Sequence, residues 1–155
     1  MECVINAGPL IFLHKISRLQ LLPALFDTVY IPKAVIGEIE AGGLFEARQL
    51  LSDVAYETLI VTNRLAVHSL LGRLHIGEAE VIVGAIEKAT PVVVLDDMYA
   101  RNKAKQLTLN VTGTLGLLLR ARELGMIKEM REEVKNLINA GMYLSDTIIG
   151  QILQT

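Results

Sequence analysis

Short apolar runs alternate with segments of helical periodicity along this chain, and the alternation limits the folds it can adopt. The runs lie at Glu2–Asn6, Thr28–Ile31, Pro91–Leu95 and Asn110–Thr112, with a less distinct one near Leu59–Val61. Apolar strands separated by helices are typical of βαβ units, whose parallel strands are buried on both faces. The sequence therefore predicts an α/β fold with a mainly parallel sheet.

The helices are predicted from apolar spacing and from Gly and Pro at the segment ends. They are expected at Leu10–Leu19, at a turn opened by Pro23, at Ala34–Ala41, on both sides of the Leu59 strand, and at Glu78–Ala89, Tyr99–Leu107, Leu115–Leu124, Lys128–Asn139 and Ser145–Leu153. Neither a repeat nor a linker interrupts this pattern, so residues 1–155 are predicted to form a single domain.

Apolar residues make up 52% of the chain and charged residues 21%, and the mean hydropathy is +0.43. This predicts either a nearly fully buried sheet or an apolar face that a partner covers. No apolar run approaches the roughly 18–20 residues that a bilayer requires, so a membrane span is not expected. The absence of a cationic leader and the single cysteine, Cys3, favour a reducing cytoplasm.

In parallel sheets, ligands bind beyond the carboxyl ends of the strands. Asp96 and Asp97 follow the Pro91–Leu95 strand directly. Two adjacent carboxylates there are costly unless a cation neutralises them, and Mg²⁺ and Mn²⁺ prefer carboxylate oxygens. The alternative is that one aspartate caps the following helix while the other is solvated.

Two further carboxylates are predicted to point toward the same edge. Helical spacing puts Glu78 beside the buried stripe of its helix and Glu80 on the opposite, water-facing side. On the helix after the second strand, Glu38 is a better inward candidate than Glu40. Glu38, Glu78, Asp96 and Asp97 would suit metal ions that activate a water and stabilise charge on a phosphodiester. Each carboxylate also has a simpler interpretation, as a helix-terminal or solvated charge.

Five segments together resemble the PIN domain family, and more narrowly its prokaryotic branch of nuclease-like proteins related to the toxins of VapBC pairs. They are Val4–Ile11, Ile31–Ile39, Gly77–Glu80, Leu95–Arg101 and Val111–Leu118, with the Thr-Gly-Thr-Leu-Gly run at residues 112–116 the most distinctive. The resemblance covers essentially the whole chain.

The resemblance implies a three-layer α/β/α sandwich with about five strands and a Mg²⁺- or Mn²⁺-dependent ribonuclease site. It also implies RNA as substrate, a homodimer and, for toxin-like members, a small antitoxin as partner. Carried over by position, the catalytic acids are Glu38, Glu78, Asp97 and Asp96, and the metal ligands are these four together with Asn6.

Position 6 departs from the family pattern, because active members carry an aspartate where this chain has Asn6, and position 8 is Gly8 in place of a common serine. An amide oxygen is still a ligand, but it brings no negative charge. Two interpretations therefore stand: an active metal-dependent ribonuclease, or a weakly active or inactive PIN domain that binds RNA or a protein.

Arg101, Lys103 and Lys105 follow the aspartate pair on one helix and are candidates for binding RNA phosphates. Such a run is also typical of a solvated helix face. Because no Gly-x-Gly-x-x-Gly follows a strand, dinucleotide binding is excluded. The aromatic residues show no interleaving with basic ones, so the sequence does not indicate a stacking platform.

Overall fold

The computed structural model describes residues 1–89 and 92–154. For residues 44 and 45 within this range it describes the backbone but not the side chains. Its strands are β1 (Glu2–Ile5), β2 (Thr28–Pro32), β3 (Glu57–Leu59), β4 (Val92–Val94) and β5 (Asn110–Thr112). Its helices are α1 (Ala7–Lys15), α2 (Leu21–Leu25), α3 (Lys33–Ala41), α4 (Leu44–Asp53), α5 (Arg64–Leu70), α6 (Ile76–Lys88), α7 (Met98–Gln106), α8 (Thr114–Glu123), α9 (Met130–Asn139) and α10 (Asp146–Leu153).

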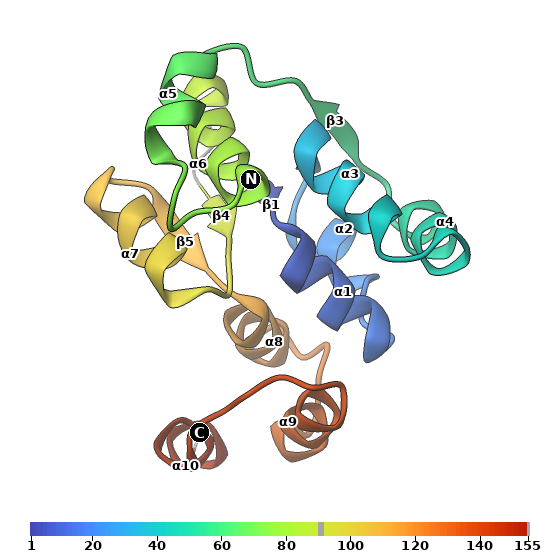
Figure 1. Ribbon diagram of the computed structural model, residues 1–155. Coiled ribbons are helices and arrows are strands. Elements are labelled where there is room, and N and C mark those ends of the chain that lie inside the picture. The colour runs from blue at the N-terminus through green and yellow to red at the C-terminus, as the bar shows by residue number, and fades with distance from the viewer. Residues whose placement is uncertain (90–91, 155) are drawn as a thin grey trace.

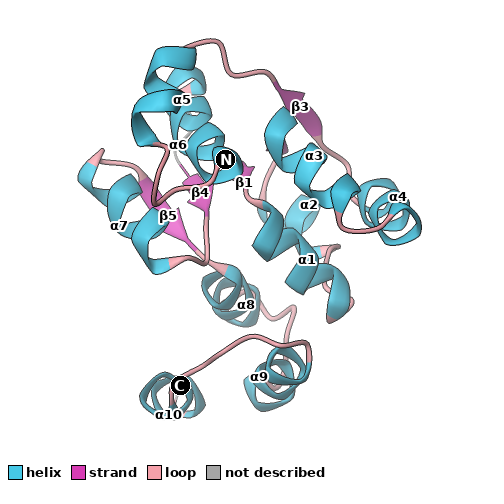
Figure 2. Ribbon diagram, in the orientation of Figure 1, coloured by secondary structure: helices cyan, strands magenta, loops and turns pink. Residues whose placement is uncertain are grey.

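All five strands are parallel and pair in the order β3-β2-β1-β4-β5, so β1 is central (Figures 1 and 2). Connections between parallel strands are right-handed. A connection that moves toward one edge of the sheet therefore places its helix on one face, and a connection that moves toward the other edge places its helix on the opposite face. The links from β1 to β2 and from β3 to β4 run in opposite directions, which gives helix layers on both sides of the sheet. The predicted α/β/α architecture is confirmed.

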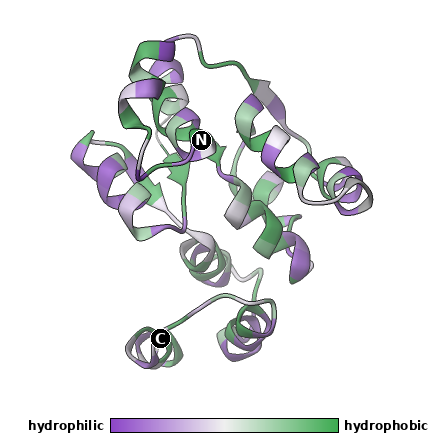
Figure 3. Cartoon of the chain, in the orientation of Figure 1, coloured by the Kyte–Doolittle hydropathy of each residue, from purple (hydrophilic) through white to green (hydrophobic). Residues whose placement is uncertain are grey.

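The central strand shows why the sheet is so apolar. Cys3, Val4 and Ile5 are completely buried, and α6 packs against β1, β2 and β4. Figure 3 shows hydrophobic residues at the centre of the molecule and a largely hydrophilic α7. Burial of both faces thus accounts for much of the high apolar content.

Several boundaries differ from the predicted ones. The predicted helix Leu10–Leu19 begins earlier and ends at Lys15, because Ser17 takes a left-handed conformation with φ 59°. There the N–H of Arg18 donates to Leu13 O at 2.7 Å, and the N–H of Ser17 donates to His14 O at 3.1 Å, a closing pattern that stops a helix. The third strand lies at Glu57–Leu59, two residues earlier than expected, while the predicted first residue of the fourth strand, Pro91, lies outside the described residues.

Within the described part of the chain, no helix combines the length and apolar character that crossing a membrane requires.

Candidate functional site

The order in which the chain adds strands to the sheet reverses between β1 and β4. This switch point places the carboxyl ends of the two strands at a crevice. β1 leads through α1 toward β2, whereas β4 leads through α7 toward β5. The two strands are paired, with Ile5 opposite Val94, and the N–H of Asn6 donates to Val94 O at 3.1 Å. Ligands bind at such switch points in open parallel sheets.

Asn6 occupies this switch point with an unsatisfied side chain. It precedes α1 as the N-cap residue, but its side chain makes no capping hydrogen bond. Its Oδ1 atom is buried and has no hydrogen-bond partner among the residues that the structure describes. Because a buried carbonyl oxygen without a partner costs free energy, this atom is suited to a bound cation or to a water molecule.

The aspartates after β4 are held in different ways. Asp96 is half-buried: its Oδ1 accepts the N–H of Thr114 at 2.7 Å, and its Oδ2 accepts the Thr114 hydroxyl at 2.6 Å. Asp97 is exposed and caps α7 by accepting the N–H of Ala100 at 2.9 Å. One aspartate of the pair therefore does cap the helix, while the other is fixed to the start of α8.

The side chain of Arg101, on α7, lies close to Asp96 at Gly113. Its Nη1 donates to Leu95 O at 3.0 Å. A Cβ atom added at Gly113 would lie 2.6 Å from that nitrogen and 2.7 Å from Asp96 Oδ1. Only a glycine at position 113 therefore leaves room for the guanidinium and the carboxylate together. Of the other two predicted phosphate ligands, Lys103 is half-buried and Lys105 is exposed.

Glu38 and Glu78 meet where α3 packs against α6. A Cβ atom at Gly77 would lie 2.9 Å from Glu38 Cδ and closer still to its Oε1, so the Glu38 carboxylate lies directly over that glycine. Glu78 is buried as predicted, but its Oε1 accepts the N–H of His75 at 3.0 Å and so caps its own helix.

The surroundings of Glu38 raise its pKa above the ordinary value. Partial burial of the carboxylate is the main cause, although the Glu38 residue as a whole is exposed. The Gly77 N–H and His75 oppose the rise in pKa, whereas the negative charges of Glu78 and Glu80 add to it. A cation near Glu38 would offset this penalty, because it favours the ionised form.

The prediction that Glu80 faces water is wrong. Glu80 is only 5% exposed. Its Oε1 accepts the N–H of Ala34 at 3.0 Å, and its Oε2 pairs with Arg64 Nη1 at 2.7 Å. Helical spacing missed this because α3 and α5 both pack on α6, which buries more than one of its faces.

The carboxylates thus form two groups, the Glu38 group (Glu38, Glu78 and the supporting Glu80) and the Asp96 group (Asp96 and Asp97). Across residues 1–89 and 92–154, no three His, Cys, Asp or Glu side chains gather closely enough to hold a metal ion by themselves. Asn6 follows β1, which lies between β2, the strand before the Glu38 helix, and β4, the strand before Asp96. The donors are all oxygens and suit a hard divalent cation, with Asn6 as the neutral donor between the two groups.

Three supporting residues were not identified from the sequence as parts of the site: Gly77, His75 and Thr114. The Thr-Gly-Thr run pointed to the region of Thr114 but not to its two hydrogen bonds with Asp96. The sequence signal for the close approach of the Glu38 carboxylate to α6 was the glycine directly before Glu78, because a glycine leaves room for a neighbouring group.

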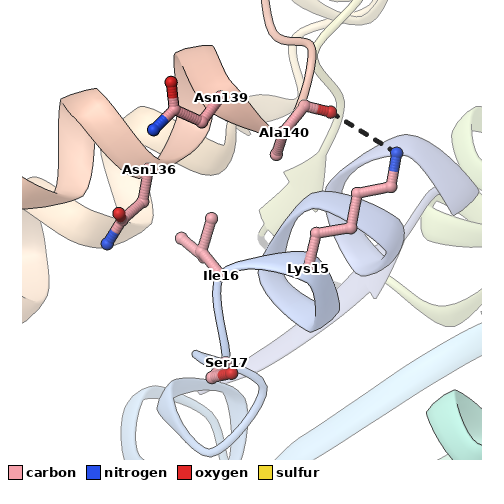
Figure 4. Close-up of a pocket in the computed structure, with 6 residues that line it drawn as sticks. All are labelled: Lys15, Ile16, Ser17, Asn136, Asn139 and Ala140. Carbon is pink, nitrogen blue, oxygen red and sulfur yellow. Dashed lines mark hydrogen bonds between the residues drawn. The ribbon is translucent and has the colours of Figure 1, made fainter.

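A separate pocket of about 550 Å³ lies between the end of α1 and α9 (Figure 4). It is lined by Lys15, Ile16, Ser17, Asn136, Asn139 and Ala140, and Lys15 Nζ donates to Ala140 O at 3.4 Å. None of these six lining residues is an acid, so the pocket is not part of the carboxylate site.

Comparison with known proteins agrees with this architecture. A solved structure of a PilT N-terminus domain protein from the hyperthermophilic archaeon Sulfolobus solfataricus P2 matches with a TM-score of 0.55 and 21% identity, over 78% of this chain and 93% of that one. At that identity the likeness concerns the fold alone. No curated protein sequence matches the chain. A family model described as a PIN domain matches residues 2–155, and the chain therefore belongs to the PIN domain family.

Proposed function

We propose that this PIN domain is a divalent-metal-dependent ribonuclease that hydrolyses RNA phosphodiesters. PIN domains have a nuclease-like fold and generally bind divalent metals. The observation that carries the proposal is the buried Oδ1 of Asn6, which lacks a partner among the described residues at the edge where Glu38, Glu78, Asp96 and Asp97 are placed. The extent of the family match also favours residues 1–155 acting as one domain.

Asn6, Glu38, Glu78, Asp96 and Asp97 would hold Mg²⁺ or Mn²⁺. When bound, such ions lower the pKa of water and stabilise negative charge on a phosphodiester. The chain contributes the positioning: Thr114 fixes both oxygens of Asp96, and Gly77 gives Glu38 room to approach. Arg101, anchored through Leu95 O beside Asp96, would bind an RNA phosphate, with Lys103 and Lys105 farther along α7.

The alternative is a PIN domain that binds RNA or a protein without cleaving it. Asn6 favours this function, since it removes one negative charge from the cation site. The separation of the carboxylates into two groups also favours this alternative. Among the described residues, no three His, Cys, Asp or Glu side chains lie close enough together to hold a metal ion. A second copy of the chain and a small antitoxin-like protein are the protein partners that we expect.

The deciding experiment is Mn²⁺-dependent cleavage of a mixed RNA pool by wild type, Asn6→Asp and Asp97→Asn. The amide introduced by Asp97→Asn retains a side-chain oxygen for the N–H of Ala100, so the cap of α7 is kept while the charge is lost. Cleavage by wild type that disappears in Asp97→Asn supports the ribonuclease. Cleavage by Asn6→Asp alone shows that position 6 switches the site off and supports the binding module.

A further inference from the structure

A stacked pair connects the two helix starts that carry the carboxylate groups. The guanidinium of Arg73, in the link between α5 and α6, lies over the ring of Tyr99 on α7, with its Cζ 4.5 Å from the ring centroid. A cation at this distance over an aromatic face is attracted by the ring. Tyr99 therefore holds the Arg73 side chain in one orientation.

Both residues lie at the edge of the sheet that carries the acids. α7 begins at this edge because it follows β4, with Asp97 as its N-cap residue and Tyr99 in its first turn. α6 begins at the same edge, since Glu80 near its start accepts the N–H of Ala34 at the start of α3. Arg73 comes shortly before α6. The stacked pair is thus placed beside both carboxylate groups.

Arg73 and Arg101 lie on different sides of α7. Tyr99, which contacts Arg73, and Arg101 are two residues apart on this helix, so their side chains point in nearly opposite directions. Arg101 lines a cleft of about 670 Å³, and Arg73 and Tyr99 do not. The other residues that line this cleft include Phe12, Met98 and Tyr143. Arg73 is therefore a second cation at the acid-bearing edge, separate from the Arg101 cleft.

The N–H groups of Arg73 are free for a ligand. Stacking uses the face of a guanidinium and leaves the five N–H donors at its edge. Arg18 and Arg64 pair with Glu133 and Glu80, but within residues 1–89 and 92–154 no acid pairs with Arg73. The residue is also exposed. An oriented, exposed and unpaired guanidinium is suited to bind an anion that arrives from solution.

We propose that Arg73, oriented by Tyr99, binds a phosphate of the RNA on the opposite side of α7 from Arg101. The assignment deepens the proposed ribonuclease and rests on RNA being its ligand. RNA carries a phosphate in every nucleotide, so one strand that crosses the acid-bearing edge brings an anion to each arginine. A planar guanidinium holds two phosphate oxygens at once. The two arginines together position the strand across the start of α7, where Asp97 lies.

The test measures the affinity of a short single-stranded RNA in EDTA, by fluorescence anisotropy, over a series of salt concentrations. Arg73→Gln is expected to weaken binding about tenfold at low salt. It should also reduce the slope of log affinity against log salt by about 0.7, the value for one lost phosphate contact on a single strand. Arg73→Lys keeps the charge, so the slope is expected to stay while part of the affinity is lost. A purely structural role of Arg73 would leave the slope unchanged in both variants.

Substitutions of Tyr99 separate the orientation of Arg73 from its charge. Tyr99→Phe keeps the ring and is expected to retain the affinity. Tyr99→Leu removes the ring but leaves the guanidinium, so the affinity is expected to fall about threefold while the salt slope stays. Equal affinities of the Phe and Leu variants would overturn the positioning role of Tyr99.

Lys88→Gln is the matched control. Lys88 also lies over an aromatic ring, with its Nζ 5.2 Å from the centroid of Tyr30, but it is at the opposite end of α6. Its removal is expected to leave the RNA affinity and the salt slope as in wild type. An equal loss in Lys88→Gln, or unchanged affinity and slope in Arg73→Gln, would overturn the assignment.

Mn²⁺-dependent cleavage of the same RNA separates the two proposals. Arg73→Gln is expected to raise KM about tenfold and to change kcat little, because the phosphate contact is made equally in the bound substrate and in the transition state. RNA binding that depends on Arg73 without any cleavage contradicts the nuclease alone. Cleavage with the same KM in wild type and Arg73→Gln contradicts the Arg73 assignment alone.

Discussion

The two carboxylate groups of this PIN domain are built in opposite ways. In the Asp96 group, hydrogen bonds from neighbouring helix starts satisfy both acids, with Thr114 on Asp96 and Ala100 on Asp97. In the Glu38 group, Glu78 and Glu80 are buried and bound to backbone N–H groups, while Glu38 lies over Gly77 with its pKa raised by burial.

We infer from this difference that the two carboxylate groups have different tasks in the proposed site. The Asp96 group is already organised, because N–H groups at the starts of α7 and α8 and the Thr114 hydroxyl hold the two aspartate side chains in position. In the Glu38 group, the surroundings of Glu38 disfavour its ionised form, and a bound cation would offset this penalty. We therefore expect substitutions in the Asp96 group to affect catalysis, and substitutions around Glu38 to affect metal affinity and stability.

The largest expected effect comes from Asp96→Asn. It removes a charge but keeps an oxygen for Thr114, so the fold is retained while RNA cleavage falls by about 100-fold or more. Thr114→Val is the matched change, since it removes only the hydroxyl that donates to Asp96 Oδ2. We expect this variant to lose roughly tenfold, as for an outer-shell partner. Initial rates at saturating Mn²⁺ measure both, and equal rates for the two variants would contradict the division of tasks.

Gly77→Ala tests the Glu38 group. The added Cβ would occupy the space of the flexible end of Glu38, so the side chain moves while the backbone stays. Calorimetric Mn²⁺ affinity is expected to fall about tenfold, and the free energy of unfolding to change by less than about 1 kcal/mol.

Gly37→Ala is the control for this change, because a Cβ at Gly37 on α3 meets nothing within 4 Å. Its Mn²⁺ affinity is expected to match that of wild type. Unchanged affinity in Gly77→Ala would show that Glu38 does not bind the metal.

Glu80 is expected to support structure rather than chemistry. Glu80→Ala leaves the N–H of Ala34 without its acceptor and should lower the free energy of unfolding by about 1–3 kcal/mol. Glu80→Gln keeps an acceptor and should cost less, because Arg64 is 44% exposed and its ion pair contributes little. Urea unfolding measures both variants. A Gln variant as unstable as the Ala variant would assign the stabilisation to the charge instead.

The smallest expected effects concern the pH dependence of stability. The pKa of Glu38 is raised, whereas the pKa of Glu87 is lowered, chiefly by the hydrogen bond from the Thr62 hydroxyl. A raised folded pKa means that the folded state binds more protons, so the contribution of Glu38 to stability is present below its unfolded pKa and lost as pH rises through its folded pKa. For Glu87 the contribution is present above its unfolded pKa and lost as pH falls through its folded pKa.

Metal-free unfolding across the acidic range checks these signs. The stability of wild type relative to Glu38→Gln should fall as pH rises, whereas that relative to Glu87→Gln should increase. Parallel curves for the two comparisons would contradict the opposite environments that the structure gives these carboxylates.

Most of the fold follows from local patterns in the sequence. Apolar runs with helices between them predict the parallel sheet, and the polar residues that follow these runs, such as Asn6 and Asp96, identify the edge that carries the acids. The candidate ligands Asn6, Glu38 and Asp96 were predicted from these positions and from the PIN resemblance. Whether they bind metal stays a prediction.

Tertiary packing decided what helical spacing could not. Glu80 was predicted to face water because spacing describes a helix with one buried face, whereas α6 is covered by the sheet, α3 and α5. The cleft that joins Phe12, Met98 and Tyr143 likewise exists only because α1, α7 and the start of α10 meet beside the sheet edge. The sequence by itself determined which residues are apolar, which are charged and where strands end, since these depend on local chemistry. Only the tertiary structure decided which charges became buried partners and which rings met the acids, because those contacts join residues that no sequence period connects.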